Sequence, residues 1–143
     1  MAHIAIFTLT SELHDEQTVN AVTRDFLGSL GIDYLFKGSD YSDYGSSTLN
    51  LIYVRTGGTE GIFKELLPVL LEKSNRPFYL LTSGKSNSLA ASMEILSYLR
   101  NHDVKGEIIH GKTEYVNSRI CLLEKIEEAR NKMDGCRLGT FFN

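Results

Sequence analysis

Features that are scarce or missing exclude several classes of protein. No apolar run approaches the ~18 residues of a membrane-spanning helix. The N-terminus has no basic segment followed by a long apolar stretch, so we expect neither a membrane partner nor a signal peptide. The chain also has no Lys/Arg-rich tract, and its net charge is −3. Because nucleic acids and acidic membrane surfaces are bound by basic surfaces, we expect neither as a partner.

Cysteine and histidine are also scarce. The two cysteines, Cys121 and Cys136, predict reduced and partly buried thiols, and with them a cytoplasmic location. No two of the four histidines have the i, i+4 spacing of metal ligands, and none adjoins a carboxylate cluster. We therefore expect no complete metal site in this chain. His110 ends a predicted strand near a possible cleft, and we expect a structural or solvent-facing role for it.

What is present is an alternation of apolar bursts and amphipathic stretches, which is typical of βα units around a parallel sheet. The 143 residues, 42% of them hydrophobic, suffice for one globular domain with a core. The predicted strands are residues 3–9, 34–37, 49–55, 77–82, 107–110 and 137–142. The predicted helices are residues 15–30, 60–73, 88–101 and 113–133. The sequence predicts an α/β fold with three αβα layers and a mostly parallel open sheet, flavodoxin- or Rossmann-like.

Two segments bear on the boundaries of this domain. Residues 38–47, rich in Ser, Asp, Tyr and Gly, are predicted to be a mobile connection. The strand predicted at residues 137–142 would end with the chain, whereas a crossover normally brings a helix back over the sheet. We therefore expect residues 1–143 to be a single domain, the N-terminal one of a longer protein.

Two glycine-containing segments resemble phosphate-binding motifs only in part. Residues 83–86 (SGKS) follow a strand, but Tyr79 stands where a phosphate loop has its first glycine. Residues 57–61 (GGTEG) lead from a strand into a helix, and Thr59 breaks the dinucleotide-binding fingerprint. Two interpretations of this second segment stay open. It is either a tight turn with positive φ angles or a close backbone approach to a ligand.

The segment after the first strand also departs from known patterns. Residues 8–11 (TLTS) carry hydroxyls but lack the glycine of a flavin phosphate loop. A phosphoacceptor domain has paired acids after its first strand and an aspartate ending its third. Thr8-Leu9 and Arg55-Thr56 occupy those places here, so neither function is favoured.

Three segments between residues 51 and 111 carry a family resemblance. They are residues 56–60 (TGGTE), 76–81 (RPFYLL) and 87–99 (NSLAASMEILSYL), and their order and spacing count for more than any one of them. Together they resemble the N-terminal domain of L-fucose isomerase-like proteins, in the L-fucose/L-arabinose isomerase superfamily. In these proteins a strand like the one predicted at the end of this chain leads into the next domain.

The resemblance implies an aldose–ketose isomerase-like protein that acts on a pentose, a deoxyhexose or a derivative. In that family a divalent metal, here expected to be Mn²⁺, polarises the sugar oxygens while a base moves a proton. The metal ligands come from later domains, so we expect no catalytic or metal-ligating residue in this one. The N-terminal domain would contribute to the subunit interface of a homo-oligomer and to one wall of the sugar pocket.

The resemblance also places the sugar-binding residues at two predicted helix starts. They are Thr59 and Glu60 at one helix, and Asn87 and Ser88 at the other. Each offers hydrogen bonds to sugar hydroxyls, and each is equally suited to capping its helix. Glu94, further along the second helix, is expected on the helix surface.

Two alternatives remain beside the isomerase domain. The chain is compatible with a self-contained, flavodoxin-like module that binds a small molecule without catalysis. It is also compatible with an isomerase architecture that has lost its activity. Fold alone does not decide among these functions. A metal cluster on the same natural polypeptide would distinguish them.

Overall fold

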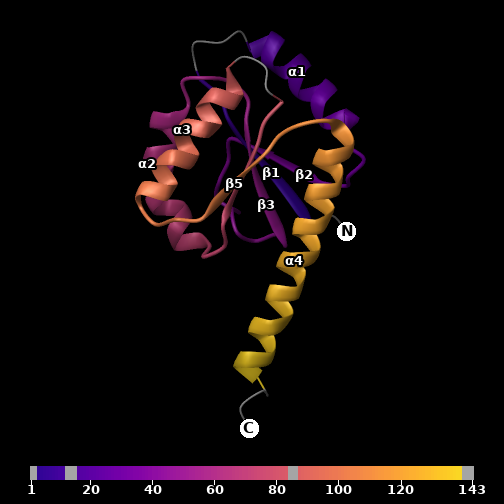
Figure 1. Ribbon diagram of the computed structural model, residues 1–143, viewed down its shortest axis with the longest axis vertical. Helices are drawn as coiled ribbons and strands as arrows, with labels where there is room; N and C mark the ends of the chain where they lie inside the picture. The colour runs from indigo at the N-terminus through magenta and orange to yellow at the C-terminus, as the bar shows by residue number, and fades with distance from the viewer. Residues whose placement is uncertain (1–2, 12–15, 84–86, 140–143) are drawn as a thin grey trace.

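Five parallel strands form a single sheet between two layers of helices (Figure 1). The computed structural model of the protein describes residues 3–11, 16–83 and 87–139. The strands are β1 (Ile4–Leu9), β2 (Leu35–Gly38), β3 (Leu49–Val54), β4 (Phe78–Leu81) and β5 (Gly106–Ile109). The helices are α1 (Glu16–Ser29), α2 (Glu60–Lys73), α3 (Ser88–Asn101) and α4 (Thr113–Gly139). The predicted three-layer α/β fold is confirmed, with every described strand pair parallel.

The strand order is β2-β1-β3-β4-β5, which is the order of flavodoxin-like sheets. The chain moves from β1 outward to β2, then returns to the other side of β1 with β3. Strands β1 and β3 pair over their full length, from Ile4 opposite Leu49 to Leu9 opposite Val54. Because crossovers between parallel strands are right-handed, the reversal at β1 puts helices on both faces of the sheet.

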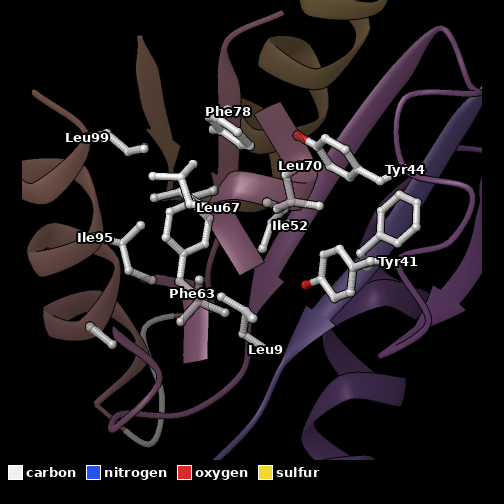
Figure 2. Packing of buried hydrophobic residues seen from close by; sticks show 14 of the residues in the cluster. Leu9, Tyr41, Tyr44, Ile52, Phe63, Leu67, Leu70, Phe78, Ile95 and Leu99 are labelled. Atoms are coloured by element: carbon white, nitrogen blue, oxygen red, sulfur yellow. The ribbon is translucent and has the colours of Figure 1, made fainter. Parts of the chain in front are cut away.

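Alternate residues of the strands pack into two separate cores. Phe7 of β1 and Ile52 of β3 belong to a cluster with side chains of α2 and α3 such as Ile95. Figure 2 shows Ile52 and Ile95 in this cluster. The neighbouring residues face α1 and α4, where Leu51 shares a cluster with Ile120. All six residues of β1 are buried. This two-sided burial explains why the central strands read as continuous apolar runs.

The segment from 38 to 47, predicted to be mobile, instead packs into the first core. The rings of Tyr41 and Tyr44 lie 5.1 Å and 5.3 Å from the ring of Phe7, measured between centroids. The Tyr41 hydroxyl donates a hydrogen bond of 2.8 Å to the carbonyl of Thr8. The polar composition suggested a solvated loop, but burial of two aromatic rings outweighs it. Figure 2 shows both rings beside Ile52 and Leu70.

A tight turn at Gly45 holds this segment against the end of α2. Gly45 has a φ of +93°, and a Cβ there would lie 2.7 Å from the carbonyl oxygen of Lys73. The Lys73 ammonium in turn donates a hydrogen bond to the carbonyl of Ser42. Glycine is therefore required at position 45 both for its backbone angle and for space.

The prediction of a strand at residues 137–142 is wrong, because α4 continues through Gly139. Figure 1 shows the second half of α4 extending past the sheet, away from any strand. A short apolar run does not distinguish a strand from a helix end, and a formed helix adds residues at little cost. The remaining residues, 140–142, lie outside the described part. The expectation of a second domain therefore rests on the family resemblance alone.

The long helix bears on two further predictions. Cys136, placed at a strand start by the sequence, lies in α4, and the thiol of Cys121 on the same helix is free and exposed instead of partly buried. No helix in the described ranges is both long and apolar enough to cross a membrane.

Two glycine substitutions should have opposite effects on stability. Gly61 is the second residue of α2, and nothing lies within 4 Å of a Cβ placed there. We expect Gly61→Ala to raise the free energy of unfolding by about 0.5–1 kcal/mol. Gly45→Ala should lower it by about 2 kcal/mol or more, through the left-handed backbone and the contact with Lys73. Urea unfolding measures both, and equal effects of the two variants would contradict the role assigned to Gly45.

Stability should fall in alkaline solution. Burial raises the pKa of Tyr41 and Tyr44 above the ordinary tyrosine value of about 10. Above that pH the unfolded tyrosines lose protons that the native ones keep, so the free energy of unfolding falls as pH rises. We expect Tyr44→Phe to reduce this slope in urea unfolding series, and Tyr115→Phe, at an exposed ring, to leave it unchanged. An unchanged slope in Tyr44→Phe would refute the assignment.

Candidate functional site

The order in which the strands are added to the sheet reverses between β1 and β3, and polar residues gather where these two strands end. Open α/β sheets bind ligands at this edge, beside the reversal point. The loops that leave the two strands are joined there by hydrogen bonds. The Arg55 amide donates to the carbonyl of Leu9 at 3.0 Å. The Ser11 amide donates to the Thr56 hydroxyl at 2.9 Å. These bonds fix the two loops relative to each other before any ligand arrives.

Arg55 places a positive charge at this edge. Its Nε donates to the Thr10 hydroxyl at 2.8 Å, and its Nη1 lies within 3.3 Å of Asn20 Oδ1 and the Thr23 hydroxyl on α1. The guanidinium therefore joins the end of β1 to helix α1. A guanidinium held in one position is suited to binding oxygen atoms of a ligand.

The glycine segment before α2 forms a tight turn. Gly58 has a φ of +73°, and a Cβ there would lie 3.3 Å from the Ser11 hydroxyl oxygen. The first of the two interpretations of residues 57–61, a turn with positive φ, therefore holds at Gly58. The same close approach brings Ser11 beside the start of α2.

A hollow of about 460 Å³ opens beside these loops, between the end of β1 and α2. Apolar side chains of α2, Ile62 and Leu66, line it together with the Thr10 hydroxyl and the Glu65 carboxylate. The volume lies within the range of small-molecule pockets. The mixture of apolar wall and hydroxyl or carboxylate groups suits a ligand that presents both C–H and O–H groups.

Two of the four predicted site residues are buried and occupied by internal bonds. Thr59 is fully buried, and its hydroxyl donates to the carbonyl of Thr56 at 3.3 Å. Ser88 is also fully buried, and its hydroxyl lies 2.5 Å from that of Thr82. Both side chains join a strand end to the helix that follows. Their observed contacts are thus structural, and any ligand contact there would have to come from the backbone.

The other two predicted residues are accessible. Glu60 forms an ion pair with Lys64, with 2.8 Å between Oε1 and Nζ. The hydrogen bond from that ammonium lowers the pKa of Glu60. A hydrogen bond to Glu60 raises the pKa of Glu94, so the start of α2 and the exposed face of α3 are neighbours. Glu94 lies on the helix surface, as predicted. Asn87 is exposed with a left-handed φ of 60°, and its side chain makes no capping bond.

The structure adds residues that sequence reasoning missed. Thr10 and Arg55 were weighed only against flavin and phosphoacceptor patterns, and the hollow lined by Glu65 has no sequence motif. One feature of the sequence could have indicated a polar site beside α1. Asn20 and Thr23 are polar residues one turn apart on that helix. His110 is exposed, as expected, with Nδ1 3.3 Å from the carbonyl of Thr82.

No group of three His, Cys, Asp or Glu side chains suited to a metal ion occurs among the described residues. Comparison with protein-family models, with curated proteins and with solved structures found no match to this chain. The case for a function therefore depends on the geometry of this edge and on the resemblance of the three segments.

The link between the two loops predicts the effect of an isosteric change. Thr56→Val removes the acceptor of the buried Ser11 amide, and we expect a loss of about 1–3 kcal/mol in the free energy of unfolding. Hydrogen exchange of the Ser11 amide should become faster. Thr56→Ser keeps the hydroxyl and should preserve the slow exchange while losing only the buried methyl. Equal exchange rates at Ser11 in the two variants would show that the bond does not hold the loops.

Proposed function

We propose that this chain is a sugar-binding α/β domain of an aldose–ketose isomerase-like protein. The observation that carries the proposal is the hollow beside the strand reversal, with its apolar wall on α2 and its Thr10 and Glu65 groups. Sugars bind through apolar contact with C–H groups and hydrogen bonds to hydroxyls, and this lining supplies both. The family resemblance implies that the ligand is a pentose, a deoxyhexose or a derivative. It rests on residues 56–60, 76–81 and 87–99.

The isomerisation expected of the family depends on a divalent metal, with Mn²⁺ our expectation. The donors at this edge do not fit such an ion. Glu60 is paired with Lys64, and Glu65 is the one carboxylate among the described residues lining the hollow. Mn²⁺ requires several oxygen or imidazole ligands that converge on one point. In this proposal the metal and the proton-transfer base therefore belong to other parts of the protein.

The proposal includes assembly into a homo-oligomer. Strand β2 is an edge strand, and Leu35 and Phe36 on it are about half exposed. Exposed apolar side chains on a sheet edge favour association with another chain. This feature supports a subunit interface at β2.

A second candidate function is a self-contained module that binds an anionic small molecule. The observation that favours it is Arg55, held at the reversal point of a flavodoxin-like strand order. A phosphate or carboxylate group would be bound there by the guanidinium. Binding of inorganic phosphate that Arg55→Gln abolishes, without any sugar binding, would favour this module over the isomerase domain.

The test is titration of the purified chain with aldopentoses and 6-deoxyaldohexoses, followed by amide chemical shifts. We expect one or more of these sugars to shift resonances of Thr10, Ile62 and Leu66. Glu65→Gln should weaken that binding about tenfold by removing a charge-assisted hydrogen bond. Glu128→Gln, on the exposed face of α4, is the matched control and should bind as wild type.

Either of two results would overturn the proposal. One is the absence of sugar-induced shifts around the hollow, and the other is unchanged binding in Glu65→Gln. Activity supplies a separate check, since we expect no aldose–ketose interconversion by this chain with added Mn²⁺. Turnover that survives repurification would contradict the assignment of the chemistry to other parts of the protein.

A further inference from the structure

A second cavity lies at the opposite edge of the sheet, where β3 and β4 begin. Its volume is about 500 Å³, and its walls come from the segment before β3, the segment after α2, and α4. The lining is strongly polar and includes Ser46, Ser47, Asn75, Arg76, Glu127 and Asn131. These residues are distant in sequence from the hollow at the carboxyl edge, and none of them lines it.

The wall of this cavity holds a buried carboxylate, one oxygen of which accepts no hydrogen bond from the described residues. The side chain of Glu127 is 1% exposed. Its Oε2 accepts hydrogen bonds from the Tyr79 hydroxyl at 2.6 Å and from Arg130 at 3.0 Å. Its Oε1 is buried and accepts no hydrogen bond from the described residues. A buried carboxylate oxygen in that state carries a substantial desolvation cost unless a donor from outside reaches it.

Arg76 compensates the charge of Glu127 but leaves Oε1 without a hydrogen bond. Its Nε lies 3.4 Å from Oε1, close enough for an ion pair without hydrogen-bond geometry. Another nitrogen of the same guanidinium donates to Asn131 Oδ1 at 3.1 Å. Arg76 and Asn131 are thus held in place around Glu127, and all three residues line the cavity.

The opposite wall is also held in place. The Asn50 side chain accepts from the Gly45 amide at 3.2 Å and donates to the carbonyl of Ser47 at 3.0 Å. The close approach of Gly45 to Lys73 fixes the same segment to the end of α2. A cavity with both walls fixed needs little reorganisation when a ligand enters.

Charge and size determine which ligand fits. The charged residues that line the cavity are Glu72, Lys73, Arg76 and Glu127, two acids and two bases, so the bases oppose a cation and the acids oppose an anion. A neutral hydroxyl group donates to Oε1 without either penalty. The volume exceeds by far the roughly 30 Å³ of a water molecule, and it matches the cavities that hold small molecules.

We propose that this cavity binds a neutral polyhydroxylated molecule, a polyol or a sugar, through a hydroxyl that donates to Glu127 Oε1. The surrounding hydroxyls and amides of Ser46, Ser47 and Asn75 provide partners for further hydroxyl groups. This second site is independent of the proposed function, because it lies on the other edge of the sheet and shares no residue with the hollow there.

The experiment is a titration of the chain with myo-inositol and glycerol, followed by amide and side-chain amide chemical shifts. We expect saturable shifts at Ser47, Asn75 and Asn131. Glu127→Gln should weaken binding about tenfold or more, since an amide nitrogen at the position of Oε1 accepts no hydrogen bond. Glu128→Gln, the adjacent exposed carboxylate on α4, should bind as wild type.

A second variant keeps the test valid if loss of Glu127 unfolds the chain. Asn75→Trp changes an exposed residue at the cavity wall and should block the probes while leaving the Tyr79–Glu127 bond intact. Glu65→Gln, which tests the other hollow, should leave myo-inositol binding unchanged. Failure at one site is thereby distinguishable from failure at the other.

Three results would overturn this inference. The first is the absence of probe-induced shifts around the cavity together with slow exchange of a water molecule bound at Glu127. That result would make the cavity a hydration site. The second is unchanged polyol binding in both Glu127→Gln and Asn75→Trp. The third is binding of methylammonium or inorganic phosphate in place of the polyols, which would assign the cavity to a charged ligand.

Discussion

The pairing of β1 with β3 is the constraint on which the rest of the structure depends. The two strands form the centre of the sheet, they pair along their whole length, and helices cover both of their faces. Buried polar groups are costly without partners, so side chains in the middle of these strands are almost all apolar. Polar chemistry is therefore confined to the two edges of the sheet. Arg55 lies at one edge and Glu127 at the other, on opposite sides of the same apolar layer.

The two edges differ because the chain enters and leaves them differently. At the carboxyl edge the strands lead directly into loops, and hydrogen bonds such as that between Ser11 and Thr56 join the loops to each other. At the amino edge the walls come from ends of helices and from the segment around Gly45. Tyr79 connects this edge to the core, because its ring is buried and its hydroxyl binds Glu127. Burial and the bond to that carboxylate raise the pKa of Tyr79, which keeps its hydroxyl a donor.

Local sequence patterns predicted most of the fold and less of the site. The five strands and four helices could be predicted because their apolar residues recur with the period of their own secondary structure. The packing of the segment from 38 to 47 could not be predicted. Its residues are mostly polar, and only the tertiary fold buries its two tyrosines. Of the candidate site, the sequence placed the helix starts at Thr59 and Ser88 after β3 and β4, where the structure has them. The burial of Thr59 and Ser88 could not be predicted, because a hydroxyl that binds a ligand and one that binds the backbone look alike in sequence.

Glu127 shows why the second cavity has no sequence signature. It lies in a charged stretch of α4, between Lys125 and Arg130, where the ordinary expectation is a solvated helix face. Its partners Tyr79, which is buried, and Arg76, which is partly exposed, come from another segment about fifty residues away. An apolar residue of similar size would often stabilise such a position at least as well, because desolvating a charge is costly. A carboxylate at this position, with one oxygen that accepts no hydrogen bond from the described residues, therefore favours a role in binding over a role in stability.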